Sequence, residues 1–110
     1  MSTDFYCDEA LSGRTPIEVV EETDAVLAFR HTRPFWPEHI VVIPKQHVPS
    51  LLEVEAPLLA ELLAVVQRVA SDVLARQGAC RVVTNLGDYQ DSKHLHFHVA
   101  ADDALRPLGR

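Results

Sequence analysis

Three of the six histidines in this 110-residue chain occupy alternate positions in one apolar segment. They are His94, His96 and His98, and the positions between them are apolar: Leu95, Phe97 and Val99. The unperturbed pKa of imidazole lies close to physiological pH, so this side chain can attack an electrophile or exchange a proton under ordinary conditions. Three imidazoles in one short segment therefore indicate chemistry.

Strict alternation of polar and apolar residues is typical of a β-strand, because successive side chains point to opposite faces. A strand over residues 94–100 places the three imidazoles on one face, about 6.5–7 Å apart along the chain. The apolar set then points to the other face, where it can pack against a helix. The pattern predicts a histidine-lined surface backed by a core.

Three interpretations of this surface are open on spacing alone. It could be a solvated polar face that happens to carry histidines. It could be a zinc site, with a further ligand from His39 or His47. It could carry out phosphorus chemistry, with one imidazole as nucleophile and its neighbours as proton donors and anion stabilisers.

The elements that must position these histidines follow from hydrophobic periodicity. Short apolar runs at 17–21 and 25–30 predict a hairpin, and the β-branched run 39–44 predicts a third strand. Residues 80–85 read as a fourth strand and 94–100 as a fifth. The two-proline stretch between the second and third strands must be a loop.

A change of period between residues 50 and 78 predicts one long amphipathic helix of about 20 residues. Ser50 and Glu53 suit a capping box for a short first turn, Pro57 suits the first position of a helix, and Gly78 suits its end. Strands followed by a long helix and further strands indicate an α+β fold with a mainly antiparallel sheet.

The amino-acid composition limits the classes of protein to which this chain can belong. With 47% hydrophobic and 24% charged residues, the chain suits one globular domain over residues 1–110. The net charge of −6 argues against tracking a nucleic acid polymer, which needs basic stripes. The two cysteines, Cys7 and Cys80, form no C-x-x-C pair. We find no signal peptide and no apolar stretch long enough for a membrane span, and expect a cytoplasmic protein without a cofactor.

The motifs then resemble those of one family. The segment "HLHFHVA" (94–100) is similar to the histidine triad signature of the HIT superfamily of nucleotide-binding proteins. Two further segments, "VLAFRHTRP" (26–34) and "PEHIVVIPKQHV" (37–48), also look like family motifs, as do Asn85 and Gly87. The match runs in order over roughly residues 5–100. It implies a HIT-like fold of about five strands, one long helix and a short N-terminal helix or turn.

The resemblance implies a mechanism. By this match, His96 attacks the α-phosphorus of a nucleotide and forms a nucleotidyl-imidazole intermediate that water hydrolyses. His98 would contact the phosphate and help the leaving group depart. His94 would sit behind it, in a hydrogen-bonded relay with His39, unless His39 is simply a structural residue at a strand end. No metal is implied.

The same resemblance places substrate contacts outside the triad. Asn85 and Gln90 would donate hydrogen bonds to phosphate oxygens, and Phe29 would line the base pocket. These residue types also suit ordinary structural roles: a turn for Asn85, a solvated loop for Gln90 and the core for Phe29. Lys45 and His47 match family positions that we interpret as structural.

The chain departs from the family pattern at four places. His31 stands where members often carry an acidic residue that binds the ribose hydroxyls, and a neutral histidine offers only one donor and one acceptor. Asp91, followed by Ser92, stands at a candidate substrate-binding position where many members have Ser or Thr and others have Glu, and its carboxylate could hydrogen-bond a triad histidine and raise the pKa of that ring. Cys7 stands alone where some members pair cysteines on zinc, and "ADDALRP" replaces the Pro-Arg that usually follows the triad.

Three functions therefore compete. The first is hydrolysis of a P–N or P–O bond at the α-phosphate of a nucleotide conjugate such as a nucleoside phosphoramidate. The second is hydrolysis of dinucleoside polyphosphates. The third, suggested by His31 and Asp91, is a nucleotide-binding regulatory module with little turnover. A homodimer is expected from the resemblance and from the broad apolar face of the helix.

Overall fold

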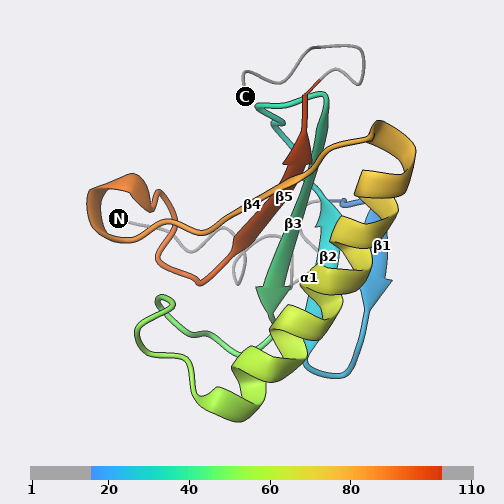
Figure 1. Ribbon diagram of the computed structural model, residues 1–110. Helices are drawn as coiled ribbons and strands as arrows, with labels where there is room; N and C mark the ends of the chain where they lie inside the picture. Colours follow the sequence, from blue (N-terminus) through green and yellow to red (C-terminus); the bar gives the residue numbers. More distant parts are fainter. Residues whose placement is uncertain (1–15, 103–110) are drawn as a thin grey trace.

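The computed structural model of the protein describes residues 16–102, which form an α+β fold (Figure 1). One long helix lies across one face of a five-stranded sheet. In chain order the elements are β1 (Val19–Glu22), β2 (Val26–Arg30), β3 (Glu38–Pro44), α1 (Ala56–Gln77), β4 (Arg81–Val83), the 3-10 turn η2 (Gly87–Tyr89) and β5 (Phe97–Ala101). The predicted fold class is confirmed, while the expected N-terminal helix or turn lies outside the described residues.

The sheet order is β1-β2-β3-β5-β4, and every neighbouring pair is antiparallel. The chain leaves β3, crosses the sheet through α1, adds β4 at the edge and then inserts β5 between β3 and β4. This crossover brings the two central strands together, so that Val41 on β3 faces His98 on β5. Segments that carry the predicted histidines are therefore neighbours in space.

Helix α1 forms where the apolar spacing predicts it, and it ends at Gly78. The backbone of Gly78 adopts the left-handed conformation, with φ 82°, and its N–H donates to the Leu74 carbonyl at 2.8 Å. One side of the helix is buried against the sheet through Leu62, Val65, Val66, Val69 and Val73. Within residues 16–102 no helix is long and apolar enough to cross a membrane.

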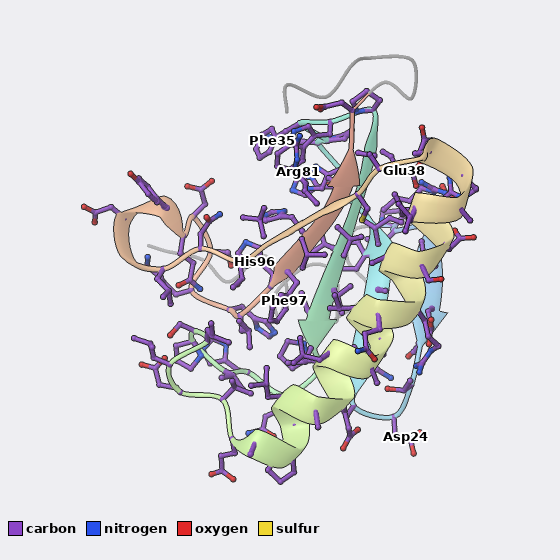
Figure 2. All side chains as sticks on the ribbon, viewed as in Figure 1. Asp24, Phe35, Glu38, Arg81, His96 and Phe97 are labelled. Atoms are coloured by element: carbon purple, nitrogen blue, oxygen red, sulfur yellow. The ribbon has the colours of Figure 1, made fainter. Side chains whose placement is uncertain are left out.

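The two faces of the sheet carry different residues. Phe97 and Val99 point toward α1 and join its apolar core, as Figure 2 shows for Phe97. On the opposite face Phe29 pairs with Val41, which in turn pairs with His98. The alternation in β5 therefore does what the sequence predicts: it separates a core face from a histidine face.

An ion-pair cluster joins one end of the sheet to α1. The carboxylate of Glu38, 7% exposed, accepts from Arg30 at 2.9 Å and from Arg76 of α1 at 3.0 Å. Hydrogen bonds from Arg76 and Arg30 hold the pKa of Glu38 below its usual value despite burial. Because this cluster joins β2, β3 and α1, it anchors both ends of the β2–β3 loop.

Strand β5 starts at Phe97, three residues later than predicted. The backbone of residues 94–96 forms hydrogen bonds with residues outside the strands and not with a neighbouring strand. The Leu95 N–H donates to the Val48 carbonyl at 2.7 Å, and the Thr84 hydroxyl donates to the His96 carbonyl at 2.8 Å. The sequence could not indicate these loop contacts. His94 precedes β5 and, unlike the two later histidines, does not line the cavity described below.

Candidate active site

A cavity of about 670 Å³ opens on the face of the sheet that α1 does not cover. Its walls come from the β2–β3 loop, at the top of the view in Figure 1, and from the β4–β5 loop, at the left. The lining residues are Phe29, His31, Thr32, Arg33, Phe35, Asn85, Tyr89, Asp91, Ser92, His96 and His98. This volume lies in the range of small-molecule sites.

His96 is oriented by the backbone two residues before it. Its Nδ1 lies 2.8 Å from the carbonyl oxygen of His94, and a carbonyl oxygen can only accept, so Nδ1 carries the proton. In the neutral ring the other nitrogen, Nε2, then holds the lone pair. The ring lines the cavity, on the side of β5 away from α1 (Figure 2). This arrangement prepares a nucleophilic nitrogen.

His98 is oriented by a second histidine. The backbone N–H of Phe35 donates to Nδ1 of His39 at 3.1 Å, so Nε2 of His39 carries the proton in the neutral ring. That Nε2 lies 2.8 Å from Nδ1 of His98, which must accept and leave its proton on its own Nε2. The chain of hydrogen bonds therefore makes His98 a donor toward the cavity.

Burial keeps this pair neutral. It lowers the pKa of His39 to about 3 and that of His98 to about 4, with neighbouring histidines adding to the effect. The ring of His31 stacks on His39 with centroids 4.3 Å apart, and burial lowers its pKa as well. At pH 7 all three rings are neutral, so their hydrogen-bond directions are fixed.

His94 corrects one prediction. It was expected to relay to His39, but His39 contacts His98, because His39 and His98 lie on neighbouring strands with their rings on one face. His94 is fully buried, does not line the cavity, and donates from Nε2 to the Pro44 carbonyl at 2.9 Å. Its Nδ1 lies 3.3 Å from Nδ1 of His47. The role of His94 at the site comes from its backbone carbonyl, which orients His96.

The other predicted residues divide into two groups. Phe29, His31, Asn85 and Asp91 line the cavity together with His96 and His98. Gln90 does not: it is 5% exposed, and its amide donates to the Pro49 carbonyl at 2.6 Å. The structure therefore uses Gln90 to tie two loops together and does not place it at a phosphate site.

Sequence reasoning missed several lining residues: Thr32, Arg33, Phe35, Tyr89 and Ser92. All belong to the two loops. A signal existed for Phe35, because a large aromatic between prolines in a loop seldom lacks a contact. Trp36, which the sequence left unassigned, packs edge-on against His39 with centroids 4.8 Å apart. It also receives the guanidinium of Arg81 on its ring face at 5.5 Å.

A metal interpretation can be tested on the same geometry. Within the described residues, ring nitrogens of His31, His39 and His98 lie within 4.8 Å of one another. However, both nitrogens of His39 already take part in hydrogen bonds, one with the Phe35 N–H and one with His98. A metal ion would have to break the second bond. The arrangement therefore favours a hydrogen-bonded pair over a metal centre.

Comparison with known proteins shows the family. Residues 12–105 match the family model described as the HIT domain. The chain belongs to the HIT family. An uncharacterized HIT-like protein of Synechococcus elongatus is 37% identical over 110 residues, covering 96% of each chain. The purine nucleoside phosphoramidase of Escherichia coli K12 is 29% identical over 113 residues, covering 98% of this chain and 95% of its own.

Solved structures show that this HIT domain has the fold of the family. A histidine triad protein from Clostridium difficile superposes with a TM-score of 0.77 at 32% identity, covering 94% of each chain. A HIT family hydrolase from Legionella pneumophila gives a TM-score of 0.78 at 30% identity, covering 90% of this chain and 92% of its own.

Proposed function

We propose that this protein hydrolyses the bond between the α-phosphorus of a nucleotide and a departing amine, through a covalent intermediate on His96. The observation that carries the proposal is the hydrogen bond from Nδ1 of His96 to the His94 carbonyl, which places the lone pair on Nε2. The similarity to a purine nucleoside phosphoramidase supports the choice of a P–N bond.

The reaction has two steps. The Nε2 lone pair of His96 forms a bond to phosphorus, while the bond to the departing nitrogen breaks and its electron pair stays with that nitrogen, which takes up one proton. Water then attacks the same phosphorus, the bond to Nε2 breaks with its electrons returning to the ring, and one proton is released. Protons therefore balance over a turnover, and the nucleoside monophosphate is the product.

His98 stabilises charge in both steps. Because His39 donates to its Nδ1, the N–H at Nε2 of His98 is aimed at the cavity before any substrate arrives. A donor that is already oriented toward developing negative charge costs no reorganisation in the transition state. Asn85, in the same wall of the cavity, supplies a side-chain amide that can donate to a second phosphate oxygen.

The test uses adenosine 5′-phosphoramidate and measures release of AMP by wild type, His96→Ala and His47→Ala. We expect turnover by wild type, a loss of at least about 10³-fold in His96→Ala, and near wild-type activity in His47→Ala. Acid-labile AMP on denatured wild-type protein would identify the intermediate. Undiminished turnover by His96→Ala would contradict the nucleophile assignment.

Two rival functions have distinct outcomes in the same assay. Faster turnover of a diadenosine polyphosphate than of any phosphoramidate would indicate a dinucleoside polyphosphate hydrolase. AMP binding without turnover of either substrate would indicate a regulatory nucleotide-binding module.

We also propose that the protein is a homodimer. Leu74 on α1 and Val82 on the edge strand β4 are large apolar side chains that are 52% and 46% exposed. An edge strand offers unpaired backbone groups to a second copy, and exposed apolar side chains beside it favour such pairing. Light scattering after size exclusion should give the dimer mass for wild type and the monomer mass for Val82→Lys.

A further inference from the structure

The two walls of the active-site cavity differ in chemistry. The wall from β2 and the β2–β3 loop carries two phenylalanines, Phe29 and Phe35, together with Arg33. The wall from the β4–β5 loop carries Asp91, Ser92 and Tyr89. His96 and His98, at the start of β5, line the same cavity. A substrate that reacts at His96 must place its two halves against two walls of different chemistry.

The first wall suits the nucleoside. A nucleobase needs an apolar or aromatic surface, and Phe35, which is 68% exposed, offers a ring face beside the mouth of the cavity. Phe29 is buried and closes the same wall from the sheet side. Arg33 adds a positive charge that suits an anionic nucleotide. The departing group must then meet the second wall, an assignment that rests on the proposed function.

The second wall carries an uncompensated negative charge. Asp91 is exposed and forms no ion pair with any residue in the described part of the chain. The lysine closest to it in sequence, Lys93, does not neutralise it. The Lys93 ammonium donates instead to the carbonyls of Gly87 and Gln90, each at 2.8 Å. A bare carboxylate beside a phosphate site repels the substrate unless a cation lies close to it.

The same wall holds a polar atom that lacks a partner. Oγ of Ser92 is buried and has no hydrogen-bond partner among the described residues, and Ser92 is one of the residues that line the cavity. Buried hydroxyls are normally satisfied, so this one is free to bond a ligand group that reaches it. Tyr89, another lining residue, is 81% exposed. A carboxylate, a hydroxyl and an open aromatic ring are the groups that receive an ammonium ion.

We propose that Asp91 makes this cavity selective for a departing amine that carries a further positive charge, with Ser92 and Tyr89 completing the subsite. The substrate class is a nucleoside 5′-phosphoramidate of a diamine or of another amine with a remote cationic group. A departing group that is itself anionic, such as a second nucleotide, meets repulsion from Asp91.

Three adenosine 5′-phosphoramidates of equal chain length test the proposal. They carry 1,3-diaminopropane (cationic), n-butylamine (neutral) and 4-aminobutanoate (anionic), so that the reacting nitrogen is similar and the remote charge differs. For wild type we expect kcat/KM to fall in that order, with the cationic compound favoured over the neutral one about fivefold to tenfold at low salt. The preference should shrink as ionic strength rises.

The variants are Asp91→Asn, Asp91→Lys and the matched control Asp88→Asn. Asp88 is an exposed carboxylate on the same loop that does not line the cavity. We expect the ratio of kcat/KM between the cationic and neutral compounds to drop to about one in Asp91→Asn and to invert in Asp91→Lys. The Asp88→Asn ratio should equal that of wild type. Because ratios are compared within each variant, partial misfolding does not affect the result.

Two failures are distinguishable. If wild type hydrolyses all three compounds with the same kcat/KM, or if Asp91→Asn keeps the wild-type ratio, the selectivity proposal is overturned while the proposed function stands. If wild type hydrolyses none of the three and no unsubstituted phosphoramidate, the proposed function fails as well.

Discussion

The protein contains two histidine pairs that look alike in sequence but differ in their surroundings. In the first, His39 and His98 share a hydrogen bond of 2.8 Å, and His98 lines the cavity. In the second, His47 and His94 approach at 3.3 Å, and His94 is fully buried and does not line the cavity. Each pair joins one residue of the triad segment to one residue from the β3 region.

The difference shows that the surroundings of an imidazole pair decide its role. The first pair is aligned by the Phe35 N–H and directs a proton toward the cavity. The second is aligned by the Pro44 carbonyl and directs its proton into the fold. The first pair should therefore control activity and the second stability, and the following substitutions separate these effects.

The largest effect is expected for His98→Ala. If the proposed function holds, removing the donor that faces the cavity should lower kcat/KM by about 10²–10³-fold, the range seen when one preset donor to developing charge is lost. The free energy of unfolding should change far less, because the ring borders an open cavity. Steady-state kinetics and urea denaturation on the same preparation measure both quantities, and a stability loss without a kinetic loss would reverse the assignment of the two pairs.

The next effect is expected for His94→Ala, and it should appear in stability. The substitution leaves a cavity in the core and removes the donor to the Pro44 carbonyl, so the free energy of unfolding should fall by about 2–4 kcal/mol. The backbone carbonyl that orients His96 remains. Residual kcat at a temperature where the variant is folded should therefore exceed that of His98→Ala, and equal kcat values for the two variants would argue against a structural role.

The pH dependence of stability distinguishes the first pair further. Burial lowers the folded-state pKa of His39 to about 3 and of His98 to about 4, below their unfolded values near 6.5. The unfolded chain therefore binds protons that the folded chain does not. Above about pH 6.5 these two rings do not lower the free energy of unfolding. As the pH decreases toward the folded-state pKa values, the free energy of unfolding falls by at most about 1.4 kcal/mol per pH unit for each ring.

Urea midpoints between pH 7 and pH 4 measure this slope. The variant His39→Asn should show a shallower decline than wild type, because one of the two titrating rings is gone. An identical slope in the variant would show that His39 does not contribute.

The smallest effect is expected for His47→Ala. His47 is exposed, so the loss of its contact with His94 should cost less than about 1 kcal/mol and change kcat/KM by less than about threefold. Thermal unfolding and AMP release measure these changes. A large kinetic loss would mean that the second pair communicates with the cavity.

Much of this arrangement could be predicted from local sequence patterns. The helix over 56–77 and the strands follow from periodicity, and the alternation around Phe97 correctly separates a core face from a histidine face. The partner of each histidine could not be predicted, because it depends on the register between β3 and β5. The position of Gln90 was missed for a similar reason: the Pro49 carbonyl that it contacts is distant in the sequence.

The insertion of β5 between β3 and β4 has a consequence for folding. His39 and His98 are 59 residues apart in the chain, so their hydrogen bond requires the pairing of β3 with β5 across a long segment. Such non-local contacts form late because their loop-closure entropy must be met first. A nucleotide that binds this cavity therefore binds the folded sheet and not the unfolded chain, and so stabilises the fold. The unfolding midpoint should rise in proportion to the logarithm of the nucleotide concentration.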